Sequence, residues 1–180
     1  MSSAPDILQF WFVQTQPAQW WKADPAFDAL VAQRFGGLHA GAAQGELAGW
    51  RRSAEGRLAE VLVLDQFSRH IHRGTPRAFA QDGMALVLAQ EAVACAADQK
   101  LPPVQQGFLY LPWMHSESRD IHAQAEPLFR NLGNDDTLNF ELRHKAIIDR
   151  FGRYPHRNAI LGRESTPEEI EFLAQPGSHF

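Results

Sequence analysis

The basic side chains of residues 150–163 are the first candidates for chemistry. Four arginines and one histidine occur there without any acidic residue, and Gly152 and Pro155 interrupt helical structure, so the basic groups converge in a loop. Clustered guanidinium groups repel one another unless carboxylates or a ligand neutralise them, and their forked donors fit carboxylate or phosphate groups. The pattern predicts a site for a small anionic molecule, with ligand contacts from Arg150, Arg153, Arg157 and Arg163. In the alternative interpretation, acidic residues of the protein itself neutralise these arginines, the candidates being Asp65, Glu117, Asp149 and Glu164.

A second segment joins an aromatic stretch to two groups that can transfer protons. Phe108 and Leu111 share a helical face with His115, and Glu117 follows two residues later. A histidine and a carboxylate at the wet end of an apolar wall are suited to general acid and base chemistry. We therefore expect His115 and Glu117 to be catalytic, together with His156 of the arginine-rich loop. The simpler alternative is a helix end at which His115 binds backbone carbonyl groups.

A third segment, residues 64–73, places charged residues on a helical face that begins in the core. Leu58, Leu62, Asp65 and Arg69 follow one stripe, so Asp65 points toward the core and needs a cation, which Arg69 can supply four residues later. One interpretation is a purely structural ion pair. The other makes Asp65, Arg69 and Arg73 ligand-binding residues.

Two further residues, His144 and Cys95, are better explained by packing. His144 lies on an apparent apolar face with Phe140 and Ile148, where a histidine is more often a core residue than a ligand; proximity to His115 would reverse that balance. Cys95, the single cysteine, is expected to be a buried packing thiol in a reducing compartment. The histidine spacings do not match helical zinc sites, and no cofactor-binding fingerprint is present, so we predict neither a metal nor a cofactor.

The composition predicts one globular domain, residues 1–180. The chain is 44% hydrophobic and 21% charged with a net charge of −4, which argues against a disordered chain and against nucleic acid as a partner. Of the 17 basic residues 14 are arginines. The start of the chain does not resemble a signal peptide, and the apolar stretches are far shorter than the roughly 20 residues of a membrane span. We expect a soluble, cytoplasmic protein with no membrane partner.

Helical periodicity and helix-capping residues dominate the whole sequence, and they predict an all-α protein. We expect about eight to nine antiparallel helices in a compact bundle, because connections are short and no alternating strand pattern occurs. The expected helical segments are residues 7–13, 25–35, 38–48, 53–71, 75–97, 102–115, 118–132, 137–151 and a short terminal helix opened by the capping box at Thr166.

The order and spacing of these segments resemble one known family. The motifs that carry the resemblance are Leu64-Asp65-Gln66-Phe67, His115-Ser116-Glu117, Arg150-Phe151-Gly152-Arg153 and Pro155-His156-Arg157-Asn158. Together they are similar to the uncharacterised bacterial family catalogued as domain of unknown function 924. The resemblance implies a helical fold related to the tetratricopeptide superfamily and no established activity. One departure is Ser68, where the family usually has proline, so a straighter helix is expected before Arg69.

Three hypotheses for function follow from the residues. The leading one is a pocket that binds, or turns over by proton transfer or hydrolysis, a small anionic molecule carrying phosphate or carboxylate. The second is a tetratricopeptide-like module that binds acidic peptide segments through the same arginines. The third is structural: each arginine is neutralised within the protein. Whether the protein is an enzyme stays open at this point.

Overall fold

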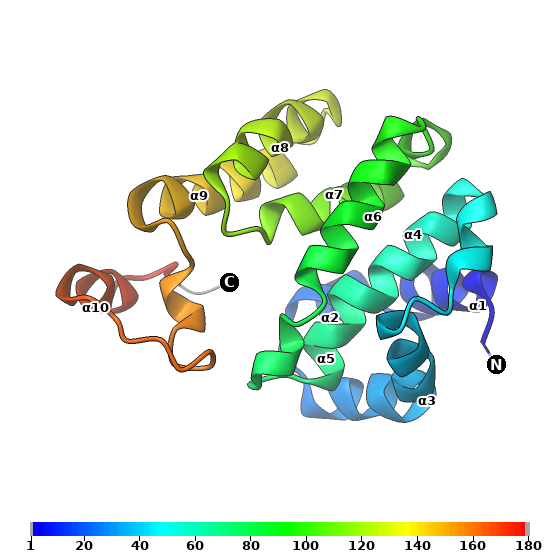
Figure 1. Cartoon of the computed structure of the whole chain (residues 1–180), viewed down its shortest axis with the longest axis horizontal. Coiled ribbons are helices and arrows are strands. Elements are labelled where there is room, and N and C mark those ends of the chain that lie inside the picture. Colours follow the sequence, from blue (N-terminus) through cyan, green and yellow to red (C-terminus); the bar gives the residue numbers. More distant parts are fainter. Residues whose placement is uncertain (1, 179–180) are drawn as a thin grey trace. The chain divides into compact units, whose positions relative to one another are not determined.

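The all-α prediction is confirmed by a computed structural model, which describes residues 2–178. These residues form helices, turns and loops, and no β-strand occurs among them (Figure 1). Tetratricopeptide-like stacking stays a prediction. The α-helices are α1 (Ala4–Gln9), α2 (Pro17–Trp21), α3 (Pro25–Ala43), α4 (Ala54–Leu62), α5 (Ser68–Ile71), α6 (Asp82–Ala94), α7 (Pro103–Met114), α8 (Arg119–Asn131), α9 (Asp135–Phe151) and α10 (Pro167–Leu173).

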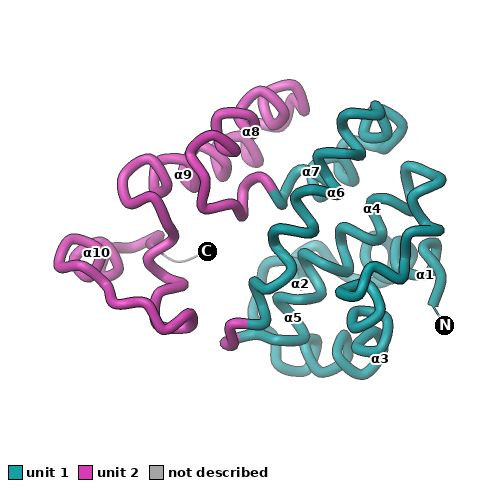
Figure 2. The backbone as a smooth tube through the Cα atoms, viewed as in Figure 1, with its two compact units in different colours: residues 1–73, 77–112 teal, residues 74–76, 113–180 magenta. Residues whose placement is uncertain are grey.

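The described chain divides into two compact units (Figure 2). Unit 1 contains the described residues up to Arg73 together with Arg77–Pro112, and unit 2 contains Gly74–Pro76 and the described residues from Trp113 onward. The expected single domain of residues 1–180 stays a prediction. Helix α7 begins in unit 1, and its last two residues belong to unit 2.

Unit 1 is built around a cluster of buried aromatic rings. Phe35 lies 4.8 Å from Phe10 and 5.0 Å from Phe67, measured between ring centroids. Trp11, which is fully buried, lies 5.5 Å from Phe67. Helices α1, α3 and α4 supply or surround these rings. Each such ring buries a large apolar area, so the cluster contributes strongly to the core of unit 1.

Helix α3 differs from the sequence prediction, which ended it at Gly36-Gly37 and began another segment at residue 38. The structure has one helix from Pro25 to Ala43. Phe35, His39 and Ala42 are buried on one face, so packing on both sides of the glycine pair compensates for the roughly 1 kcal/mol that each glycine costs a helix. Tertiary contacts therefore override the local signal.

The helix expected over residues 53–71 is present but irregular. A π-helical turn, Val63–Phe67, separates α4 from α5, and the hydroxyl of Ser68 donates to the carbonyl oxygen of Leu64 at 2.5 Å. A straighter helix was expected because this chain has Ser68 where the family usually has proline. That straighter helix is not observed. Nε2 of His39 lies 2.7 Å from the same hydroxyl, so Ser68 is fully committed within the core.

Two other expectations for unit 1 are wrong. The helix expected from residue 75 begins at Asp82, after a single 3₁₀ turn over Pro76–Ala78, because proline at 76 starts a turn that the chain does not continue as α-helix. Cys95 is exposed and does not pack in the core. It is the residue that follows α6, where the chain has left the buried face.

Unit 2 begins with a helical hairpin. Helices α8 and α9 pack against each other, and Asn134 caps α9 by accepting a hydrogen bond from the amide of Thr137 at 3.1 Å. Gly152 ends α9 in a left-handed conformation, with φ of 70°, as the sequence predicted. Ile148 and Tyr154 are fully buried in the small core next to this end. The loop that follows carries the arginine-rich motif.

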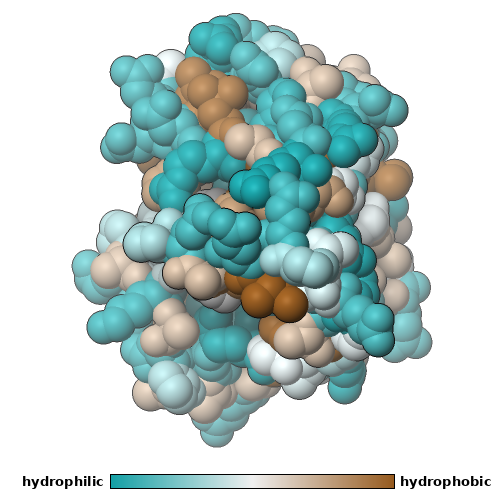
Figure 3. Space-filling view, turned by 90° about the vertical axis from the view of Figure 1, so that its left-hand side faces the viewer, coloured by the Kyte–Doolittle hydropathy of each residue, from teal (hydrophilic) through white to brown (hydrophobic). Residues whose placement is uncertain are grey.

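The surface shown in Figure 3 is mostly hydrophilic, with separate hydrophobic areas. Within residues 2–178, we find no helix with the length and apolar character needed to cross a membrane.

Two glycine substitutions test the packing of unit 1. A Cβ atom on Gly56 would lie 1.9 Å from the carbonyl oxygen of Trp50, whereas one on Gly37 would meet no atom within 4 Å. We expect Gly56→Ala to lower the free energy of unfolding by about 3 kcal/mol, because backbone must move. Gly37→Ala should raise it by roughly 0.5–1 kcal/mol, since alanine favours helix. Urea denaturation measures both, and equal effects would contradict the described path of α3 and α4.

Candidate functional site

The end of α7 is held by three side chains from two other parts of unit 2, α8 and the loop after α9. The carbonyl oxygens of three consecutive residues each accept a hydrogen bond: Met114 from the hydroxyl of Tyr154 at 2.5 Å, His115 from Nη2 of Arg157 at 3.0 Å, and Ser116 from Nε2 of His122 at 2.9 Å. A helix end leaves carbonyl groups without partners in the helix, and buried ones must find partners elsewhere. We call this arrangement the α7 clamp.

Tyr154 is the centre of a cluster of histidines. Its buried ring lies 5.7 Å from the ring of His144 and 5.5 Å from that of His156, and its hydroxyl oxygen lies 3.1 Å from Nε2 of His122. The guanidinium of Arg157 lies over the same ring at 4.7 Å. One aromatic residue therefore gathers three imidazoles and a permanent cation.

His144 lies deep within this cluster. Its pKa is lowered from 6.5 to about 3, mainly by burial and in smaller part by the neighbouring charges of His115, His122 and His156. Its Nδ1 bonds the carbonyl oxygen of Phe140 in the same helix at 2.7 Å. The expected burial of His144 is confirmed, and its imidazole is neutral at physiological pH. The charge of His115 is among those that lower this pKa, and a functional role for His144 stays a prediction.

His122 and Glu141 form a buried pair that joins α8 to α9. Both side chains are fully buried, and Nδ1 of His122 lies 2.6 Å from Oε1 of Glu141. Burial raises the pKa of Glu141 above its ordinary value, although its bond to His122 acts in the opposite direction. The second carboxylate oxygen of Glu141 has no hydrogen-bond partner.

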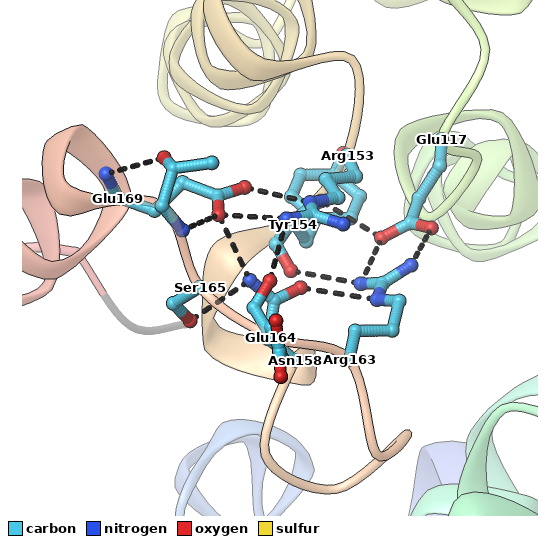
Figure 4. A network of polar contacts seen from close by, with 9 residues as sticks. Glu117, Arg153, Tyr154, Asn158, Arg163, Glu164, Ser165 and Glu169 are labelled. Carbon is cyan, nitrogen blue, oxygen red and sulfur yellow. Dashed lines mark hydrogen bonds and ion pairs between the residues drawn. The ribbon is translucent and has the colours of Figure 1, made fainter.

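Two arginines of the 150–163 segment bind glutamates through paired hydrogen bonds (Figure 4). Arg163 reaches Glu117 at 2.6 and 2.9 Å, and Arg153 reaches Glu169 at 2.6 and 2.8 Å. The side chain of Asn158 connects them by accepting from Arg163 and donating to Glu169. This fork geometry is the strongest arginine–carboxylate arrangement, and it ties the loop to α10 and to the start of α8.

Glu117 is part of that network and is ionised within it. Burial opposes its ionisation, but Arg163 and the amide of Tyr154, which donates at 2.8 Å, hold its pKa below the ordinary value. A carboxylate held in this way does not donate a proton at neutral pH. Its acid or base role stays a prediction, whereas its contribution to the network is structural.

The third segment lies in unit 1 and also consists of ion pairs. Arg69 contacts Asp65 at 3.1 Å, as its spacing predicted, and also Asp82 at 2.9 Å. Arg73 and His70 both bind Asp28, at 2.5 and 2.7 Å. These contacts place Arg69, His70 and Arg73 each beside an acidic group.

Acidic residues of the protein therefore neutralise most of the arginines that were predicted to bind a ligand. Some of these acidic residues are not the expected ones. Arg150 forms an ion pair with Glu168, at 2.8 Å. Asp149 pairs with Lys145 instead, and Glu164 offers Arg153 only its backbone carbonyl. Ligand contact by the predicted residues stays a prediction; they are Asp65, Arg69, Arg73, Arg150, Arg153, Arg157 and Arg163.

A shallow depression is lined by Glu117, Ser118, Arg119, Asp120 and Gly152, but Arg119 donates to the carbonyls of Ile148 and Asp149 at the end of α9. Among residues 2–178, no group of three or more histidine, cysteine, aspartate or glutamate side chains is arranged to hold a metal ion.

Comparison with known proteins places this architecture in a family. The family model for bacterial proteins of unknown function, DUF924, matches residues 7–177. The chain belongs to the DUF924 family. A solved structure from Agrobacterium tumefaciens, a protein of unknown function, is 42% identical to it, with a TM-score of 0.90 over 95% of this chain and 96% of that one. A search of curated proteins found no match.

The resemblance to DUF924 is thus confirmed, but the motifs that carried it do not include the whole site. His122 and Glu141 were missed because they lie in ordinary helices, 19 residues apart. A signal did exist: His122, Ala125 and Phe129 follow core spacing in α8, as do Glu141, His144 and Ile148 in α9. Polar side chains at core positions of two packed helices need hydrogen-bond partners, and they commonly bond to one another.

The pair formed by Arg153 and Glu169 generates a pH prediction for this DUF924 protein. Arg153 lowers the pKa of Glu169 from 4.5 to about 2, against the effect of burial, with help from the amide of Thr166. A lowered pKa in the folded state stabilises the protein above pH 4.5, and that stabilisation is lost as pH falls toward 2. Glu169→Gln should lower the free energy of unfolding at pH 7 by about 3 kcal/mol.

The matched control is Glu168→Gln, which removes an exposed partner of exposed Arg150. The side chains in that pair are 61% and 47% exposed, so we expect a change within about 0.5 kcal/mol. Urea denaturation at pH 7 and pH 3 should show the Glu169→Gln deficit shrinking in acid. A deficit that is independent of pH would contradict the ion-pair account.

Proposed function

We propose that this DUF924 protein binds a small molecule carrying a carboxylate or phosphate group at the histidine cluster of unit 2. The observation that supports this most is the gathering of His144, His156 and Arg157 around the ring of Tyr154, with His115 close enough to affect His144 electrostatically. Imidazolium and guanidinium groups are the side chains best suited to bind planar or tetrahedral oxyanions.

The acids of the neighbouring segments already form pairs of their own. Glu117 is paired with Arg163, and Glu141 is paired with His122. Each pair contributes little net charge, whereas Arg157 is permanently charged and the two partly exposed imidazoles of His115 and His156 gain charge as pH falls. An anion placed near either imidazole would favour its protonated form.

Within this proposal His115 and His156 exchange protons with the bound molecule. Both are partly exposed, unlike buried His122 and His144, so solvent and ligands can reach them. The backbone of His115 is fixed, because its own carbonyl and those of both neighbours are bonded in the α7 clamp. A fixed backbone limits the orientations of its imidazole, as proton transfer requires. Binding of an acidic peptide stays a prediction.

Sulfate is the probe for the anion site, because its charge stays constant across histidine titration. We expect binding, followed by NMR signals of the histidine side chains, to strengthen roughly tenfold from pH 8 to pH 5.5 as imidazoles gain charge. His156→Gln should weaken binding and flatten this pH dependence. The signals of His115 should shift on titration with sulfate.

The control is Arg130→Gln, which removes a positive charge from α8. Arg130 is 59% exposed and pairs only with Glu126 of its own helix among the ion pairs described. This variant should bind sulfate like the wild type. An absence of binding by the wild type, or equal weakening by both variants, would overturn the proposal in favour of a general charge effect.

A further inference from the structure

We propose that His122 and Glu141 are positioning residues for the anion site: they hold one proton between them and use it to fix the backbone at His115. The inference rests on the proposed function for its consequence in binding. The effect of the pair on the α7 clamp is tested separately from ligand binding, by hydrogen exchange of the Ser116 amide and by the NMR signals of His115.

The hydrogen-bond partners of His122 determine where its protons are. Nε2 lies 2.9 Å from the carbonyl oxygen of Ser116, which can only accept, so Nε2 carries a proton. The hydroxyl of Tyr154 donates to Met114, so its oxygen is also an acceptor toward Nε2 at 3.1 Å. Both contacts require the same N–H group. These two acceptors identify Nε2 as a protonated nitrogen of His122.

A second proton lies between Nδ1 and Glu141. The two atoms are 2.6 Å apart, and two lone pairs would repel at that distance. Either the imidazole is protonated beside a carboxylate, or a neutral imidazole accepts from a carboxylic acid. The pair has the same number of protons and no net charge in both cases, which suits two side chains that are fully buried.

The pair acts on the site through the backbone. His122 binds the carbonyl that follows His115 in sequence, and Tyr154, which contacts His122, binds the carbonyl that precedes it. Removing the acceptor from Nδ1 would let the imidazole rotate or change tautomer, and the Ser116 carbonyl would lose its donor. The segment on which His115 lies would then sample other conformations. Outer partners of this kind commonly change affinity without touching the ligand.

The main test compares Glu141→Leu with Glu141→Gln. Glutamine can donate its amide N–H to Nδ1 and preserve the Nε2–H tautomer, whereas leucine cannot. We expect Glu141→Leu to speed hydrogen exchange of the Ser116 amide, which bonds the carbonyl of Trp113 at 3.1 Å, by at least about tenfold. It should shift the imidazole signals of His115 and weaken sulfate binding about tenfold. Glu141→Gln should keep all three within about twofold of the wild type.

The matched control is Glu60→Leu in unit 1. Glu60 is 1% exposed and bonded to Arg51, so its replacement also removes a buried paired carboxylate. It should lower stability without changing Ser116 exchange, the His115 signals or sulfate binding. Equal changes in both leucine variants would show a general loss of stability and overturn the positioning role.

The outcomes separate this inference from the proposed function. If the wild type does not bind sulfate, the proposed function fails, while Ser116 exchange and the His115 signals still test positioning. If sulfate binds and Glu141→Leu changes none of the readouts, positioning fails alone. Should Glu141→Leu not fold, nitrogen NMR of His122 in the wild type decides: a protonated Nε2 supports the inference, and an unprotonated Nε2 overturns it.

Discussion

A helix that ends within a protein must have its last carbonyl groups satisfied, and the end of α7 is where unit 2 meets this requirement. Met114, His115 and Ser116 each present a carbonyl oxygen that a side chain from elsewhere in the unit binds. The donors come from α8 and from the loop after α9. Because the lost hydrogen bonds of buried carbonyls are costly, the positions of these elements are linked to one another.

The same constraint explains why polar residues occupy core positions in unit 2. His122 can serve as a donor only if its second nitrogen has a partner, and Glu141 on the adjacent helix supplies it. The hydroxyl of Tyr154 donates to Met114 from a buried ring that packs with Ile147 and Ile148. The histidine cluster is thus a consequence of closing one helix end, and the proposed anion site would use the backbone that this closure fixes.

Local signals predicted much of the fold and less of the site. Capping at Asp24 and Thr166 and termination at Gly152 depend on neighbouring residues, and the structure contains these features where the expected helices begin or end. Helix α9 begins two residues before its expected start, after a cap at Asn134 that was not predicted. The glycine pair in α3 was misjudged because its compensation is tertiary. In α9 the hydrophobic pattern favoured Phe140 as a core residue, but Phe140 is 49% exposed and Glu141 is buried in its place. That rotation of the buried face by one residue hid Glu141.

Most partners of the arginines were beyond sequence reasoning for a different reason. Arg153 and Arg163 bind glutamates 16 and 46 residues away, so only the folded chain shows which acid pairs with which base.

The central claim is that Arg157, His115 and His156 form an oxyanion site on the frame of the α7 clamp. A crystal structure with selenate, located by its anomalous scattering, tests this most directly. The account predicts an anion within hydrogen-bond distance of the imidazole of His115 or His156, and selenate bound only elsewhere would contradict it.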